Sequence, residues 1–128
     1  MQDNHSFEYA VIRLVPQVER EEFLNVGVIL YCRQHQFLQM KFTLDEQRLH
    51  TTFPGADINE IRLHLQAFEQ ICRGDAKGGP IALLDIASRF RWLTAKRSTV
   101  VQTSDVHPGL CSDPMETLNK LHRQLVLL

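Results

Sequence analysis

The chain has 128 residues, of which 44% are hydrophobic and 23% are charged, and its net charge at pH 7 is −1. These values are typical of one globular domain, large enough to bury a core without cross-links. A nearly neutral chain exerts no global attraction on nucleic acid or anionic membranes, so such binding would depend on a local patch. We expect no membrane span, because no apolar run approaches ~18 residues, and no secretory leader in the polar residues 1–6.

Three cysteines, an odd number, lie far apart at Cys32, Cys72 and Cys111. A disulfide framework is therefore not expected, and a reducing cytoplasm is the predicted location. The histidines are scattered, and no nucleotide-binding glycine motif occurs, so we expect no metal and no cofactor. His107 shares a predicted loop with Cys111, but no local signature supports a Cys–His nucleophile there.

The first third of the chain predicts an antiparallel β-meander. Residues 7–16 are rich in β-branched and aromatic side chains, and the run ends at Pro16. A charged loop at 17–22 precedes a second predicted strand at 24–33. In the third, at 37–44, apolar and polar residues alternate, as in a half-buried strand. A fourth strand is predicted at 98–103, where Thr and Val are frequent.

The remainder predicts mainly helices, at 57–73, 81–92 and 114–127, with a short helix within 45–52. Asp57 begins the first of these as an N-cap and Gly74 ends it, while Asp113 followed by Pro114 begins the last. Strands followed by helices predict an α+β fold in which helices cover one face of an antiparallel sheet. We expect one domain over residues 1–128, with a loose terminus at 1–6.

Two polar residues and a glycine interrupt the apolar runs of the first hairpin. Arg13 lies in the first strand, and alternation places Asn25 and Gly27 on one face of the second. If the loop is centred on residue 19, Arg13 lies opposite Asn25, and if it is centred on residue 20, Arg13 lies opposite Gly27. An odd register would place Arg13 beside Val26 instead.

A half-buried guanidinium requires hydrogen-bond acceptors, because arginine does not lose its charge. Two sources of acceptors are open: glutamates folding back from the loop (Glu19, Glu21, Glu22), or the phosphate or carboxylate of a ligand. Gly27 within a strand is typical of a bulge or of another group lying close to the backbone. An internal Arg–Glu pair with Asn25 satisfying a bulge is the structural alternative to an anion pocket on the sheet.

Residues 89–97 contain the only basic cluster, Arg89, Arg91, Lys96 and Arg97, interleaved with Phe90 and Trp92. Basic residues near aromatic rings suit phosphate or single-stranded nucleic acid, and they equally suit the C-terminal turn of a helix. Arg97 beside the hydroxyls of Ser98 and Thr99 is the part best suited to phosphate. Nucleic acid is not favoured as a partner, because the chain as a whole is nearly neutral.

The stretches YAVIRLVP (9–16) and EFLNVGVIL (22–30), with WLT (92–94) and RSTV (97–100), resemble a bacterial family of short single-domain proteins, domain of unknown function 3037. The chain departs from the family pattern at Pro108, where a hydroxyl residue is expected. The family label implies no activity. The resemblance supports Arg13, Asn25, Gly27 and Arg97 as positions to test, and it implies a kinase-like protein as a partner.

Two functions follow as expectations. The first is a small cytoplasmic interaction or regulatory protein that binds another protein, and it predicts an exposed apolar patch or a free sheet edge. The second is a phosphate-ester or nucleotide-handling protein, and it predicts side chains that converge on one concavity. The candidate residues for an anion or partner site are Arg13, Glu22, Asn25, Gly27, Arg97 and Ser98, with a loop glutamate as a base in the second case.

Overall fold

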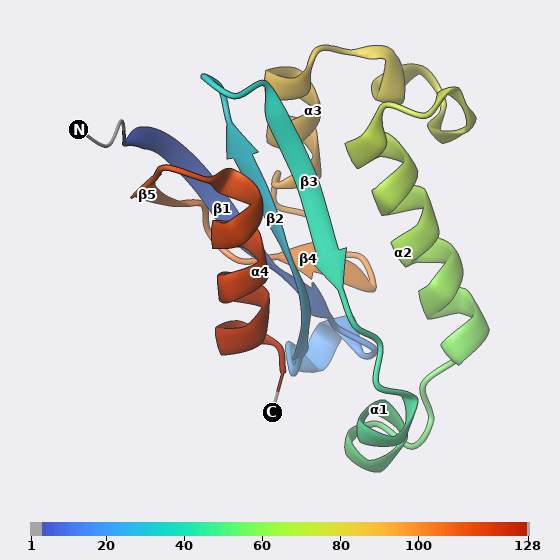
Figure 1. The fold of residues 1–128 in the computed structure, drawn as a ribbon. Coiled ribbons are helices and arrows are strands. Elements are labelled where there is room, and N and C mark those ends of the chain that lie inside the picture. The colour runs from blue at the N-terminus through green and yellow to red at the C-terminus, as the bar shows by residue number, and fades with distance from the viewer. Residues whose placement is uncertain (1–3, 128) are drawn as a thin grey trace.

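A five-stranded antiparallel sheet organises residues 4–127, the part of the chain that the computed structural model describes (Figure 1). Its strands are β1 (His5–Leu14), β2 (Leu24–Cys32), β3 (Phe37–Phe42), β4 (Val101–Thr103) and β5 (His107–Cys111). The order is β3-β2-β1-β4, and β5 pairs with the N-terminal half of β1. β4 and β5 therefore share one edge of β1, and β3 forms the opposite edge of the sheet.

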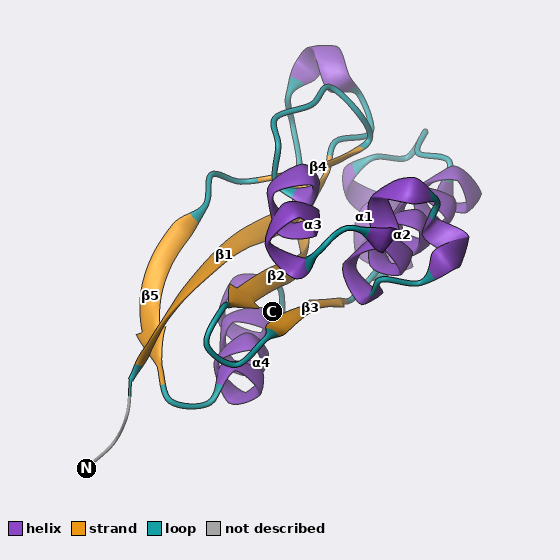
Figure 2. Ribbon diagram, turned by 90° about the horizontal axis from the view of Figure 1, so that it is seen from above, coloured by secondary structure: helices purple, strands orange, loops and turns teal. Residues whose placement is uncertain are grey.

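Helices cover both faces of the sheet. α2 (Ile58–Arg73) and α3 (Ile86–Leu93) lie on one face and α4 (Pro114–Leu125) on the other, while α1 (Glu46–Thr52) follows β3 (Figure 2). Short 3-10 turns occupy Val18–Arg20, Ala76–Gly78 and Pro80–Leu83. The expectation that helices cover one face only is therefore wrong. No helix among residues 4–127 is long and apolar enough to cross a membrane.

An aspartate begins each of the four α-helices. In every case its carboxylate accepts a hydrogen bond from a backbone N–H of the first turn, the pattern of an N-cap. The four capping residues are Asp45, Asp57, Asp85 and Asp113. The cap at Asp85 corrects the predicted helix at 81–92, because residues 80–83 form a separate 3-10 turn and the exposed Leu84 precedes the cap.

Two apolar cores result from strand alternation, one on each face. Ala10, Ile12 and Leu14 of β1 belong to the larger core, which contains the buried residues of α2 and α3. Phe7 of β1 belongs to the smaller core, which contains Leu118 of α4. Consecutive β1 side chains therefore lie on opposite faces of the sheet. The face on which a candidate residue lies determines which other candidate residues it can contact.

Strand boundaries differ from the predictions at both ends of the chain. His5 and Ser6, expected in a loose terminus, begin β1 and pair with β5, whereas residues 1–3 lie outside the described part. β5 itself lies where a loop with Pro108 is predicted. Proline is tolerated there because β5 is at the sheet edge, where one side of the strand has no ladder partner.

Candidate functional site

Arg13 stands opposite Asn25 in the β1–β2 ladder, which is one of the two even registers that the sequence allows. The register shifts between Ile12, paired with Gly27, and Arg13, so Val26 is the extra residue of a β-bulge. Alternation alone would place Asn25 and Gly27 on the same face of β2, but the bulge places them on opposite faces. Asn25 lies on the α4 face, where its Nδ2 donates to the Leu125 carbonyl at 3.3 Å. Gly27 faces the larger core, and a Cβ there would lie 3.2 Å from Ile12 Cδ1.

The Arg13 guanidinium has an aromatic neighbour but, within residues 4–127, no ion-paired acidic partner. Its Cζ lies 4.1 Å from the centre of the exposed Phe23 ring, which is a cation–π distance. Gln102 of β4 pairs with Arg13 on the other side of β1, so an amide side chain flanks it on both sides. Within residues 4–127, the buried Nε of Arg13 and the buried Oδ1 of Asn25 make no hydrogen bond. The sheet therefore holds a charged side chain, Arg13, that lacks, in the described chain, a hydrogen-bond acceptor for its buried N–H.

Glu22 does not supply the missing acceptor. Its carboxylate pairs with Arg20 within the same loop, where both side chains are more than half exposed. The hydrogen bond from Arg20 and its positive charge hold the pKa of Glu22 below its ordinary value. The expectation of a loop glutamate folding back onto Arg13 is therefore not met by Glu22, and the structure records no ion pair for Glu19 or Glu21 within the described chain.

Arg97 lies away from Arg13, beside α2. Its guanidinium stacks on Trp92 at 4.3 Å and donates to the carbonyls of Trp92 and Ala95. It borders a small hollow with residues of α2, on the larger-core face of the sheet. Its partial burial lowers the pKa of Arg97. Ser98 is exposed in the following loop. The structure therefore brings Arg13 and Asn25 together, but not Arg97 and Ser98 with them.

Each member of the basic cluster at 89–97 is held by a different internal partner. Arg91 makes two hydrogen bonds, of 2.8 and 2.7 Å, to the Glu8 carboxylate. Arg89 donates to the Leu84 carbonyl at 2.6 Å, and Lys96 donates to Asp105 at 2.7 Å. The cluster thus ties α3 and the chain after it to the rest of the fold.

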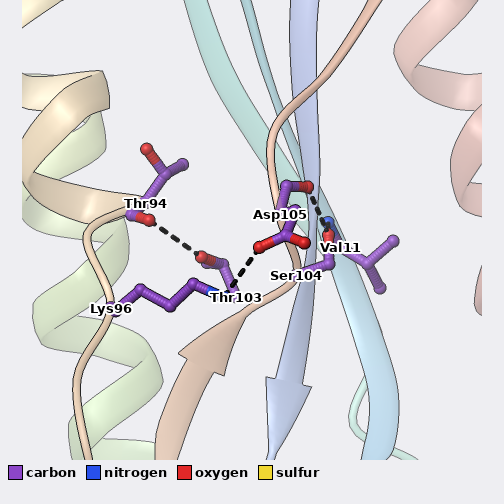
Figure 3. Close-up of polar contacts among 6 residues, drawn as sticks. All are labelled: Val11, Thr94, Lys96, Thr103, Ser104 and Asp105. Carbon is purple, nitrogen blue, oxygen red and sulfur yellow. Dashed lines mark hydrogen bonds and ion pairs between the residues drawn. The ribbon is translucent and has the colours of Figure 1, made fainter.

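Ser104 replaces a backbone partner where β4 passes into β5, a feature that the sequence does not suggest (Figure 3). Its hydroxyl accepts from the Val11 N–H at 2.8 Å and donates to the Asp105 carbonyl at 2.9 Å, while its own N–H donates to the Val11 carbonyl at 2.8 Å. The buried hydroxyl keeps the β1 ladder satisfied across an irregular turn. The Lys96 ammonium lowers the pKa of Asp105, and Arg13 adds a smaller effect.

The loop between β1 and β2 borders a cleft of about 400 Å³ that reaches the beginning of α2. Its wall is apolar at Phe53 and Ile61, and it is charged at four residues, Arg20, Glu22, Asp57 and Glu60. Two of these charges neutralise each other in the Arg20–Glu22 pair, and Asp57 already caps α2. The fourth, Glu60, lies 3.6 Å from His64 on the same helix. Each of the four charged groups therefore already has a neighbour within the protein.

The Cys–His arrangement considered near residue 107 has the wrong environment for a nucleophile. Cys111 is buried, whereas His107 is exposed and stacks near Tyr9 at 5.4 Å between ring centres. Burial raises the pKa of the Cys111 thiol, which disfavours the reactive thiolate. Among residues 4–127 no three His, Cys, Asp or Glu side chains are grouped as metal ligands would be.

The edge formed by β3 is the second candidate region. In the described part of the chain β3 pairs with β2 alone, and a groove of about 440 Å³ lies between this edge and α2. Six residues line it, three from each element: Leu38, Gln39, Met40, Glu69, Cys72 and Arg73. The alternating pattern at 37–44 predicts the strand, but it carries no signal of an edge position, because edge position depends on the path of the whole chain.

A comparison with protein-family models matches residues 9–126 to a family described as proteins of unknown function, DUF3037. The chain belongs to this family. The match covers both candidate regions, the Arg13–Asn25 pair and the β3 edge, so both lie within the family domain. Neither a curated protein nor a solved structure gives a significant match.

Proposed function

We propose that the protein is a small interaction or regulatory protein that binds another protein, and that a kinase-like protein is the first partner to test. The observation that supports this is the unpaired edge of β3. Strand edges offer rows of backbone donors and acceptors, and proteins use them to bind extended segments of other chains. The three cysteines are all free thiols, which supports a reducing, cytoplasmic setting for the interaction.

The opposite edge of the sheet is protected, and the contrast supports this choice. β4 has three residues, Ser104 interrupts the edge, and β5 carries Pro108, which has no N–H to donate. Short strands, irregular turns and prolines are the usual ways in which proteins prevent edge pairing. β3 has six residues and contains neither proline nor glycine. The two edges therefore differ in the way expected if β3 is kept available for a partner.

Site-specific photo-crosslinking in cells of the source species tests this function. A photoreactive residue replaces Gln39 at the groove, and matched positions are Gln66 on the outer side of α2 and the exposed Leu110 on β5. We expect one protein to crosslink from Gln39, and the purified protein to bind the purified chain in calorimetry. If no protein crosslinks from any of the three positions, the interaction function is wrong.

A phosphate-ester or nucleotide-handling function is the second candidate, and the buried Nε of Arg13, which has no acceptor within residues 4–127, favours it. Because Arg97 lies on the other face, the anion site is reduced to Arg13 and Asn25. Thermal unfolding with inorganic phosphate, nucleotides or sugar phosphates tests it, since ligand at about 100 times its Kd adds about 2.7 kcal/mol. A shift in the wild type that disappears in Arg13→Met supports this candidate, and the absence of any shift contradicts it.

A further inference from the structure

The backbone groups of alternate β3 residues point away from the sheet. The Thr43 N–H donates to the Val26 carbonyl at 2.8 Å, and the register pairs Lys41 with Val28. In an antiparallel ladder, hydrogen-bonded and non-hydrogen-bonded pairs alternate. The N–H and C=O groups of Leu38 and Met40 therefore face outward, into the groove beside α2.

The side chains of this groove suit an extended peptide. Leu38 and Met40 belong to the larger core and present its apolar border, and Cys72 on α2 is 1% exposed. Glu69 and Arg73 of α2 form the rim and are ion-paired at 3.1 Å. A strand added beside β3 would place every second side chain against α2 and the others toward the α4 side. The groove thus combines unpaired backbone groups with an apolar wall for alternate side chains.

The position of α2 favours a single segment over a second copy of the chain. A symmetric β3–β3 pair would bring two α2 helices to the same face, above the two new neighbouring strands. Since α2 already borders the space beside β3, the second helix would compete for the same volume. An isolated extended segment carries no such helix.

Charge around the groove indicates the chemistry of that segment. The guanidinium groups of Arg73 and Arg89 both act on Cys72, where they oppose the effect of burial and of Glu69 on the pKa of the thiol. Arg73 is paired with Glu69, whereas Arg89 donates only to the Leu84 carbonyl, and its buried Nε has no partner within residues 4–127. Arg89 does not line the groove, and Asp85 lies near enough for the Arg89 charge to lower the pKa of its carboxyl. Arg73, whose side chain is 66% exposed on the rim, is therefore the cation that a bound segment meets.

We propose that the β3–α2 groove accepts an extended segment of a partner protein as a sixth strand of the sheet. The segment has apolar side chains toward α2, alternating with polar ones, and an acidic residue beside Arg73. The inference rests on the proposed interaction function and gives it a binding mode.

Selection from a displayed library of random eight-residue peptides, with the wild-type chain as the target, tests the inference. We expect the selected peptides to alternate apolar and polar residues, to contain an acidic residue and to lack an internal proline. Binding of the best synthetic peptide should shift the backbone amide resonances of Leu38 and Met40, and proline inserted at its centre should abolish binding.

Two variants of α2 form a matched pair for this measurement. Arg73→Glu reverses a charge at the groove, and Arg62→Glu does the same on the same helix, where Arg62 pairs with Glu46 outside it. We expect affinity for the acidic peptide to fall by about tenfold or more in Arg73→Glu, which corresponds to about 1.4 kcal/mol, and to be unchanged in Arg62→Glu.

Several outcomes would overturn the inference. The first is that no peptide is selected. The second is that the selected peptides shift resonances at the Arg13 surface, or in the cleft between the β1–β2 loop and the beginning of α2, and not in the groove. The third is that both variants bind the peptide equally well. A chain that forms dimers through β3 would show a second copy as the occupant. If photo-crosslinking finds a partner at another surface, the groove inference fails while the interaction function survives.

Discussion

Arg13 lies directly opposite Asn25 across the β1–β2 ladder, and a bulge at Val26 sets this pairing. The two side chains each leave one buried polar atom, Nε and Oδ1, without a hydrogen bond in the described chain. Unsatisfied buried polar atoms lower stability and are uncommon in native proteins. A sheet that keeps such a pair on its α4 face therefore sacrifices some stability, as functional sites commonly do.

The first prediction concerns the stability of an Arg13→Met variant. Methionine keeps the length and apolar contact of the side chain over Phe23 but removes the half-buried charge. We expect the free energy of unfolding, measured with urea, to be unchanged or higher by up to about 1 kcal/mol. Arg91→Met is the comparison, and should lose about 0.5 kcal/mol, because its ion pair with Glu8 is partly exposed. A loss above about 2 kcal/mol in Arg13→Met would indicate a structural role.

The second prediction concerns the contact that requires glycine at position 27. A Cβ there would lie 2.8 Å from both the Lys41 carbonyl oxygen and Phe42 Cβ, so β3 would have to move. We expect Gly27→Ala to lower the free energy of unfolding by about 1–3 kcal/mol. Gly55→Ala is the matched control, since a Cβ at that position would meet no atom within 4 Å, and it should change stability by less than about 0.5 kcal/mol. Equal effects of the two substitutions would contradict the prediction.

The sequence predicts the meander and the capped helices because their signals are local. Alternation at 37–44 and the caps at Asp57 and Asp113 each depend on a few neighbouring residues, and the structure confirms the elements that they predict. β5 lacks such a local signal, because its pairing with β1 joins segments about a hundred residues apart. Proline and glycine within β5 indicate a loop, and only the position of the strand at an edge makes them compatible with pairing.

For the candidate site too, the features that depend on a few neighbouring residues are predictable from the sequence, and those that depend on the path of the whole chain are not. The opposition of Arg13 and Asn25 is one of the registers that loop length allows, so the sequence restricts it to a few choices. The separation of Arg13 from Arg97 follows from the face of the sheet on which each side chain lies. Alternation along β1 places Arg13 on the α4 face, whereas the path of the chain after α3 places Arg97 on the larger-core face. The edge position of β3 follows from the whole strand order, and no single segment encodes it.

The third prediction concerns the reactivity of the groove cysteine. Burial raises the pKa of Cys72 to about 12. Since the thiolate is the reacting species, about one molecule in 10,000 carries it at about pH 8. We expect an alkylating reagent to leave Cys72 unmodified in the native protein and to modify it fully in urea, as read by peptide mass mapping. Rapid native modification of Cys72 would show that the groove opens to solvent more than the structure indicates.

The fourth prediction concerns His122, a buried residue of α4 whose Nε2 lies 3.0 Å from the Oγ1 of Thr43, the residue after β3. Burial, and then the charge of Lys41, lower the pKa of His122 below its ordinary value of about 6.5. At pH values between the lowered pKa of the folded state and the ordinary pKa, the unfolded chain binds more protons than the folded one. The stabilisation from a neutral His122 is therefore complete above about pH 6.5 and is lost as the pH falls below it. Urea unfolding across this range should show a smaller decrease for His122→Gln, which retains a hydrogen-bonding group but does not titrate. Equal pH slopes for the variant and the wild type would contradict the assignment to His122.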